Sequence, residues 1–375
     1  MVSPATLVQS PAPSSWRARL SLPVSAQSLA VIRIVFGAIL LWDCFRYISA
    51  ERIRRYYVDV EMTFPYFGLD FIQPLPEPLI HWAWWLVGLS SFLVMIGLFY
   101  RVAIVTFIVT FGYFFLLDRT QYLNHNYMVL LYAFLLALSP AHRMWSLDAR
   151  LWPAIASTVI PYWPVAAIRL QTEIILIYAG IVKITDDWLR GEPLRIWTHE
   201  AIGRVWIAPI FQWDWVVMAA AIGTIMLHVF GAPLLLWNRT RIWIFLIYCT
   251  FHVSNAIFFN IGIFPWLTIA ITTIFFAPDW PERLAVRAFG GQVAAPSPLR
   301  QALGFSRIPT ALMTVLALWF AVQIALPMRQ VLFPTAVGWT GDGHRFSWRM
   351  RIYDRRARGD FLVETPDGSK SWTVD

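Results

Sequence analysis

One short stretch gathers most of the side chains that could do chemistry. Residues 117–127 read Leu-Asp-Arg-Thr-Gln-Tyr-Leu-Asn-His-Asn-Tyr, which brings together a carboxylate, a guanidinium, an imidazole and three amides. Apolar runs flank the stretch, from Val102 before it and as far as Leu138 after it. Polar groups at the edge of hydrocarbon are costly to hold, so they commonly mark functional sites. The alternative is a re-entrant turn whose side chains only satisfy backbone groups.

His125 is the first acid–base candidate in this stretch. Asn124 and Asn126 flank it, and Asp118 lies seven residues earlier. An imidazole with amide partners in a low-dielectric site suits proton transfer near neutral pH. We therefore predict a catalytic role for His125, with Asp118, Asn124 and Asn126 as ligand-binding residues. A histidine that only caps a helix at the membrane face is the alternative.

A second histidine lies on an otherwise apolar helix. The sequence around it is Cys-Thr-Phe-His-Val-Ser-Asn, with His252 followed by Ser254 and Asn255. We predict proton transfer for His252 and ligand binding for Ser254 and Asn255, with a simple packing histidine as the alternative. His228 is flanked only by apolar residues and is predicted to be structural.

Lys183 ends an apolar run just before Asp186 and Asp187. One interpretation is a lysine that extends to the interface and pairs with a carboxylate. The other is a desolvated amine whose pKa is lowered, which would make it a base. Within the same run, Arg169 and Glu173 have the spacing of an ion pair on one helix face.

The composition indicates a membrane protein. The chain has 375 residues, of which 58% are hydrophobic and 14% are charged, whereas about a quarter are charged in soluble domains. The net charge of +8 is spread over loops, without the basic, aromatic-interleaved stripe of a nucleic-acid-binding protein. Cys44 and Cys249 both lie in apolar runs, and no His–carboxylate group has metal-ligand spacing. We predict neither a disulfide framework nor a metal site.

Nine apolar stretches are predicted to be helices, and about 20 residues are needed to cross a bilayer. The predicted fold is an all-α polytopic membrane protein, with about eight to nine transmembrane helices and a small C-terminal β segment. Residues 1–25 are predicted to be disordered, 26–327 to form the helical domain and 328–375 to form the β tail. The nine stretches are 28–49, 79–99, 102–117, 125–141, 164–185, 214–237, 240–258, 260–277 and 308–327.

The tail alternates apolar and polar residues. Phe346, Trp348, Met350 and Ile352 alternate with polar neighbours, and an Asp-Gly pair follows at 367–368. Such alternation around an Asp-Gly turn predicts a β-hairpin. We expect Trp348 and Met350 on one face of a strand, with arginines on the other.

Arginine counts predict the orientation. With a cytoplasmic N-terminus, the inner segments hold eleven arginines and the short outer loops hold seven, which favours this topology. The 118–126 turn, the loop from Asp186, the end of the seventh helix and the tail would then share the outer face. The inner arginines are Arg17, Arg19, Arg101, Arg143, Arg150, Arg239, Arg241, Arg283, Arg287, Arg300 and Arg307, and the outer ones are Arg52, Arg54, Arg55, Arg119, Arg190, Arg195 and Arg204.

Several stretches together resemble one family, the vitamin K-dependent γ-glutamyl carboxylases and their bacterial relatives, which share the HTTM membrane domain. The similarity runs from about residue 28 to 375. The stretches are 96–101 (Ile-Gly-Leu-Phe-Tyr-Arg), 117–120 (Leu-Asp-Arg-Thr), 124–127 (Asn-His-Asn-Tyr), 179–183 (Ala-Gly-Ile-Val-Lys), 187–188 (Asp-Trp), 251–255 (Phe-His-Val-Ser-Asn), 277–281 (Ala-Pro-Asp-Trp-Pro) and 346–350 (Phe-Ser-Trp-Arg-Met).

The resemblance implies an integral membrane enzyme. It would oxidise reduced vitamin K, a menaquinol-type hydroquinone, with O2 to the epoxide, and the base so formed would let CO2 add to a glutamate. The implied partners are membrane lipid, the hydroquinone and a glutamate-containing peptide or protein, which the segment around Trp348 would help to bind. The implied location is a bacterial inner membrane, with the tail extracytoplasmic.

The chain departs from this family at one residue. Animal members carry a lysine, assigned as the base, directly after the aspartate of the Leu-Asp-x-Thr motif, and here that position is Arg119. A guanidinium stays protonated and cannot act as a base. Arg119 could still hold an oxyanion, so the catalytic candidates are Arg119, His125, Lys183 and His252. The alternative is a non-catalytic lipid- or quinone-binding or transport module with the same fold.

Overall fold

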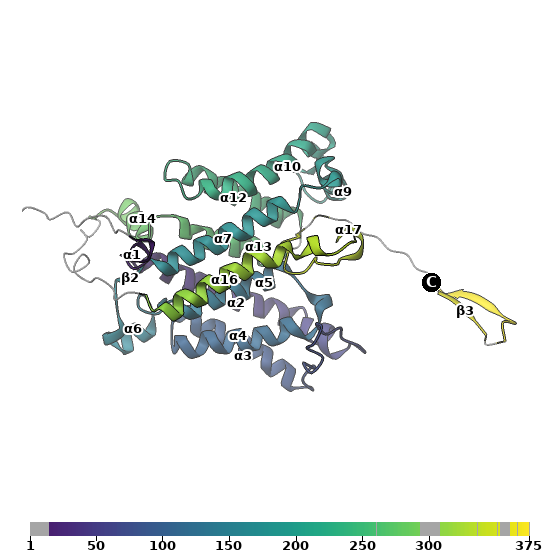
Figure 1. Cartoon of the computed structure of the whole chain (residues 1–375), viewed down its shortest axis with the longest axis horizontal. Helices are drawn as coiled ribbons and strands as arrows, with labels where there is room; N and C mark the ends of the chain where they lie inside the picture. Colours follow the sequence, from purple (N-terminus) through teal and green to yellow (C-terminus); the bar gives the residue numbers. More distant parts are fainter. Residues whose placement is uncertain are drawn as a thin grey trace, which may run out of the picture.

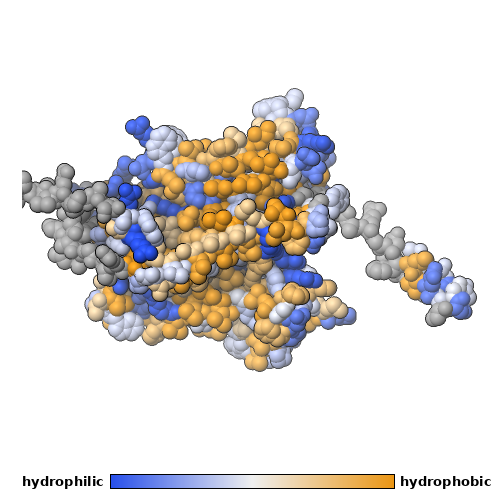
Figure 2. Space-filling view, viewed as in Figure 1, coloured by the Kyte–Doolittle hydropathy of each residue, from blue (hydrophilic) through white to orange (hydrophobic). Residues whose placement is uncertain are grey.

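Long apolar helices lying side by side form the body of the protein (Figure 1). The computed structural model describes residues 15–259, 261–292, 308–335, 337–350, 352, 361–365 and 367–374. In the space-filling view an apolar band lies between two more polar ends (Figure 2). This is the surface expected of a protein whose middle faces hydrocarbon.

Seven helical stretches of the described residues are long and apolar enough to cross a membrane. They are α2 (Gln27–Ser49), α3 (Leu79–Ile96), α4 (Tyr100–Leu117), α7 (Trp163–Ile181), the run formed by α10 (Asp214–Met226), η5 (Leu227–Gly231) and α11 (Ala232–Leu234), α12 (Arg241–Phe258), and α16 (Thr310–Met328) with η7 (Arg329–Leu332). The prediction of an all-α polytopic membrane protein is confirmed.

Two further apolar helices are shorter. They are α5 (Asn124–Leu138) and α13 (Phe264–Thr272), which continues as the 3-10 turn η6 (Thr273–Phe275). The 15 residues of α5 rise only about 22 Å, less than the roughly 30 Å of a hydrocarbon core. Since α5 is short and begins only after the polar 118–123 turn, the bundle has room for a cavity at that end.

The end of the bundle opposite this cavity is closed by small elements. They are α1 (Trp16–Leu20), β1 (Pro23–Ser25), α6 (Leu147–Leu151), η3 (Pro153–Ile155), β2 (Val159–Pro161) and α14 (Trp280–Phe289), with β1 and β2 paired antiparallel. Asp148 caps α4 here, since its carboxylate accepts the Phe99 N–H at 2.7 Å and the Tyr100 N–H at 2.9 Å. Residues 15–25 therefore contain a helix and a strand, where the sequence predicted disorder. Residues 1–14 lie outside the described residues.

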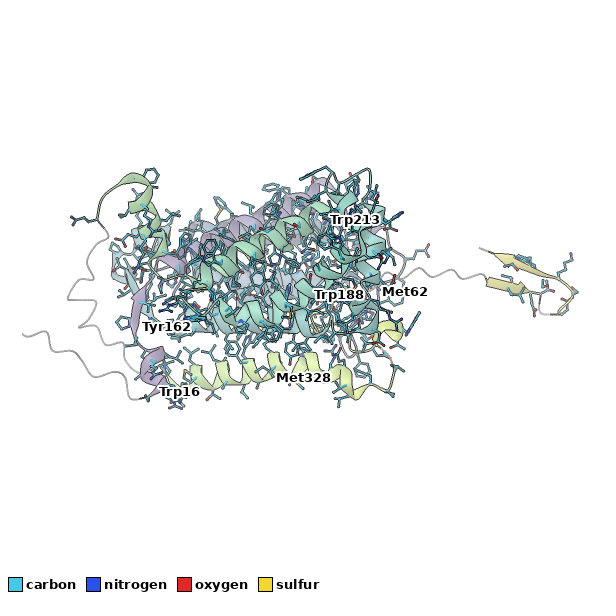
Figure 3. The ribbon with its side chains drawn as sticks, turned by 90° about the horizontal axis from the view of Figure 1, so that it is seen from above. Trp16, Met62, Tyr162, Trp188, Trp213 and Met328 are labelled. Carbon is cyan, nitrogen blue, oxygen red and sulfur yellow. The ribbon has the colours of Figure 1, made fainter. Side chains whose placement is uncertain are left out.

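The other end carries most of the polar turns and is called the cavity end below. Its elements are η1 (Arg54–Val58), η2 (Arg119–Gln121), α8 (Asp186–Leu189), α9 (Glu192–Glu200), η4 (Ala208–Gln212) and α17 (Val337–Thr340). In Figure 3, Trp188, Met62 and Trp213 lie toward this end, and Trp16 and Tyr162 lie at the opposite one.

The C-terminal tail is only partly as predicted. The hairpin is present, with β3 (Phe361–Glu364) antiparallel to β4 (Ser371–Val374), and Figure 1 shows it apart from the helices. The strand expected around Trp348 and Met350 is wrong, because residues 345–348 form turns. Phe346 and Trp348 adopt left-handed φ values of 61° and 59°, which a strand cannot contain. Arg351 lies outside the described residues.

Candidate functional site

A central cavity of about 700 Å³ opens at the cavity end of the bundle. Its walls come from the ends of α2, α5, α7, α12 and α13, from η5, and from residues 343–350, called the tail turn below. Cavities of roughly 300–1,000 Å³ commonly hold small organic ligands. Aromatic and charged side chains share the wall, including Tyr47, Trp188, Trp197, Phe251, Phe264, His125, Lys183 and His228.

Lys183 is buried in this wall. Its side chain follows the end of α7, and the residue is only 5% exposed. The amine donates to the carbonyl oxygens of Ala179 at 3.0 Å and Met350 at 3.2 Å, and it lies 5.2 Å from the Trp188 ring centre. No ion pair joins Lys183 to a carboxylate among the described residues. Asp186 and Asp187, its predicted partners, are exposed. Burial lowers the pKa of the amine to about 8.

His228 also lines the cavity, although the sequence indicated only a structural role. It lies in η5, a π-helical turn inside a membrane-crossing helix, and such turns are frequent at functional sites. Its Nδ1 lies 2.8 Å from the Thr224 carbonyl oxygen. Gly180 of α7 permits the close approach of the two helices, since a Cβ there would lie 2.8 Å from the His228 Cβ. Lys183 lies near enough for its charge to act on His228.

His125 also lines the cavity, beside two guanidinium groups. Arg46 and Arg52 are close enough for their charges to act on it. Arg46 pairs with buried Asp43 at 2.7 Å, and Arg52 lies 4.9 Å from the Tyr47 ring centre. Of the described lining residues, Arg46, Arg52, Lys183 and Arg349 are basic and Asp43 alone is acidic. The cavity is therefore suited to a ligand that carries or develops negative charge.

The tail turn covers the cavity through backbone contacts. The Asn124 amide donates to the Arg349 carbonyl oxygen at 3.1 Å, and the Phe346 N–H donates to the Tyr122 hydroxyl at 2.8 Å. Together with the bond from Lys183 to the Met350 carbonyl, these contacts bind the tail turn to η2, α5 and α7. Asn124 therefore lines the cavity and also holds the tail turn in place.

The predicted residues of α12 take different positions. Asn255 lines the cavity and donates to the Phe251 carbonyl oxygen. His252 is 1% exposed and packs against the rings of Tyr248 and Phe264, and neither of its ring nitrogens has a hydrogen-bond partner among the described residues. It does not contribute to the cavity wall as described. Ser254 faces outward and is exposed.

A second cavity of about 710 Å³ adjoins the central one. Arg119, Arg345 and Arg349 line it, and Thr120, His344 and Arg349 line both cavities. The Arg119 side chain is exposed and belongs to this second cavity only, while its carbonyl oxygen accepts from the Arg345 Nε at 3.0 Å. Asp118 caps η2, since its carboxylate accepts the Thr120 N–H at 2.7 Å and the Thr120 hydroxyl at 2.8 Å.

Two other predicted residues support the site from outside the cavity wall. Trp348 is fully buried and stacks on Tyr127 at 5.2 Å. The Asn126 side chain lies close enough to Tyr47 to act on its hydroxyl. The ion pair suggested for Arg169 and Glu173 is not formed. Arg169 instead donates to the carbonyl oxygens of Ile274, Phe275 and Phe276 at the end of the α13–η6 segment, as helix C-termini favour.

Comparison with known families gives two matches. The family model described as HTTM domain matches residues 22–280, and the one described as vitamin K-dependent gamma-carboxylase, lumenal domain, matches residues 308–375. The chain belongs to the HTTM family. Both matches together make it a gamma-carboxylase-like HTTM membrane protein. No solved structure matches the chain.

The residues that sequence reasoning missed in this HTTM protein are His228, Arg46 and Arg52. A signal existed for the arginines, since Arg46 lies in the last turn of the first membrane-crossing run and Arg52 follows that run, both close to Asp43. For His228 the signal was its presence within a membrane helix, where ionisable groups are rare and usually functional.

Proposed function

We propose that the central cavity binds a menaquinol-type hydroquinone and that this HTTM protein oxidises it with O2. The size of the cavity supports binding of a bicyclic ring, and the aromatic rings of Tyr47, Trp188 and Phe264 provide apolar walls for it. The excess of basic groups around the cavity favours the ionised form of such a ligand.

The arrangement of Lys183 is the observation that carries this proposal. A neutral amine has two N–H groups, and the Ala179 and Met350 carbonyl oxygens accept both. Its lone pair is then left for a ligand hydroxyl. With a pKa lowered to about 8, a useful fraction of Lys183 is neutral near physiological pH. Lys183 therefore offers the base that Arg119 cannot provide.

We propose separate roles in this reaction for several residues of the cavity wall. A bound hydroquinone and O2 would supply the oxidation, which yields the epoxide and one water molecule, and CO2 addition replaces a γ-proton of glutamate. The Lys183 Nζ takes the hydroxyl proton, while Arg46 and Arg52 stabilise the negative oxygen. His125, next to these arginines, exchanges protons at its ring. The tail turn excludes water from one side.

The second cavity is proposed to bind the acidic partner. Arg119, Arg345 and Arg349 contribute three guanidinium groups, which suit carboxylates well and outnumber the single carboxylate of Asp342 among the described residues of the same wall. Because the two cavities share lining residues, a glutamate side chain held there would lie next to the hydroquinone site. We further propose that the cavity end faces outward from a bacterial inner membrane, as the arginine counts favour.

The test uses purified protein with reduced naphthoquinone, O2, bicarbonate and a glutamate-rich peptide, and it measures epoxide and added CO2. Lys183→Met should abolish epoxide formation, and His125→Ala should reduce it by about two to four orders of magnitude. Lys370→Met is the matched control, because Lys183 and Lys370 are the two lysines of the chain and Lys370 is exposed in the hairpin.

The outcomes separate enzyme from binding protein. Epoxide without added CO2 would indicate a hydroquinone oxidase that does not carboxylate. Tight hydroquinone binding without any epoxide would leave a quinone-binding or transport module. Equal epoxide formation in wild type and Lys183→Met would refute the role given to Lys183.

A further inference from the structure

His228 presents one acceptor and no donor to the central cavity. A carbonyl oxygen only accepts hydrogen bonds, so the contact with Thr224 requires the proton on Nδ1. The ring is 4% exposed and lies close to the Lys183 amine. Protonation of the ring would place a second positive charge in this buried position, which is costly. The neutral ring then has its lone pair on Nε2. No residue of the described ranges bonds to this nitrogen.

The ring cannot easily turn to present a different atom. Its Nδ1 is anchored to Thr224, and the rings of Tyr248 and Phe251 meet it edge to face at 5.7 Å and 5.0 Å. The Tyr248 hydroxyl is itself occupied, since it donates to the Leu227 carbonyl oxygen at 2.9 Å. Gly180 of α7 packs against the His228 Cβ, where an added side chain would have no room. The orientation of Nε2 is therefore fixed before a ligand arrives.

We infer that His228 makes the cavity selective for the reduced form of its ligand. A hydroquinone hydroxyl can donate to the Nε2 lone pair, whereas a quinone or epoxide oxygen has only lone pairs to offer. A buried acceptor that faces another acceptor is left without a hydrogen-bond donor, which costs binding free energy. His228 is thus a specificity residue beside the base Lys183, and it favours release of the oxidised product. This inference rests on the proposed hydroquinone binding.

Two bicyclic probes test the selectivity without any turnover. Binding of 1-naphthol, which has a hydroxyl donor, is compared by calorimetry with binding of 1-methoxynaphthalene, whose ether oxygen only accepts. The ratio of the two affinities is then compared between protein variants. The probes differ in solubility, but this difference is the same for every variant and cancels in the comparison. In His228→Phe the preference for 1-naphthol should fall by about tenfold to one hundredfold relative to wild type. His142→Phe, at the opposite end of the bundle, should leave the ratio unchanged.

Lys183 needs a control of its own, because its ammonium form could donate to an ether or carbonyl oxygen. The comparison is therefore repeated in Lys183→Met protein, where the effect of His228→Phe on the ratio should persist. In wild-type protein with 15N-labelled histidine, 1-naphthol should also shift one unprotonated ring nitrogen signal, and 1-methoxynaphthalene should not. This second measurement decides the matter if His228→Phe fails to fold.

The results distinguish the inference from the function on which it rests. If wild type binds neither probe, the proposed hydroquinone site is refuted, and the selectivity with it. If both probes bind but the ratio is the same in wild type and His228→Phe, the site stands and the role of His228 is refuted. The inference is supported if the ratio falls in His228→Phe and stays unchanged in His142→Phe.

Discussion

Gly180→Ala is the sharpest test of how the site is positioned. An added Cβ would lie 2.8 Å from both the His228 Cβ and the Val229 Cγ2, whereas carbon atoms pack at about 3.5–4.0 Å. The helices must separate by roughly 1 Å, and overpacking of this kind costs about 1–3 kcal/mol. Alanine recovers about 0.5–1 kcal/mol as a better helix former. The net loss of stability should be about 0–2.5 kcal/mol.

The matched control is Gly223→Ala in α10, where an added Cβ meets no atom within 4 Å. There only the helix preference acts, so stability should rise by about 0.5–1 kcal/mol. Denaturant unfolding in detergent measures both variants, and 1-naphthol titration reports whether the walls of the cavity still meet. If Gly180→Ala is as stable as Gly223→Ala and binds the probe with wild-type affinity, close packing of α7 on η5 does not position the cavity wall.

Four further predictions follow from the same structure. The rate of hydroquinone oxidation should rise about tenfold from pH 7 to pH 9 and then level off, because Lys183 acts as a neutral amine with a pKa of about 8. The free energy of unfolding should rise from pH 8 to about 10.5, because the lysine of the unfolded chain keeps its proton up to the higher pH. Asp148→Ala should destabilise the protein by about 1–2 kcal/mol in denaturant unfolding, through loss of the α4 cap. In intact cells a membrane-impermeant thiol reagent should label Gln121→Cys and spare Asn238→Cys, and the reverse pattern would overturn the orientation. Arg119→Lys should change affinity for an acidic peptide while epoxide formation stays within about twofold, which the combined assay would show.

The sequence predicts the helical body well and the cavity only in part. Each of the nine predicted stretches contains a helix, because a run of apolar residues has a strong, local signature. Among the described residues, however, only seven helical stretches are long and apolar enough to cross a membrane, fewer than the eight to nine predicted. Lys183 and His125 could be identified from polarity alone. For His228 the sequence offered only its presence in a membrane helix, because its position at the cavity depends on the close approach of α7 at Gly180. Contacts between distant segments leave no local pattern.

The error in the tail has a physical cause as well. Phe346 and Trp348 alternate with polar residues as in a strand, yet both pack into an aromatic cluster with Tyr127. Burial of alternate residues fits a strand on a half-buried surface, but it also fits successive turns whose bulky side chains point inward. Left-handed φ angles at non-glycine residues are costly and are retained where surrounding contacts impose them. Here those contacts hold the tail turn over the cavity.

The position of Arg119 changes how its substitution is interpreted. In the sequence it stands where related enzymes carry the lysine assigned as base, which suggests a lost function. In the structure its side chain lines the second cavity, and the buried amine at the central cavity belongs to Lys183. Under the proposed function, proton removal would belong to the central cavity and anion binding to the second one, and Thr120 and Arg349 line both. An arginine at 119 is compatible with this division, because the second cavity needs a lasting positive charge and a guanidinium provides it at every physiological pH.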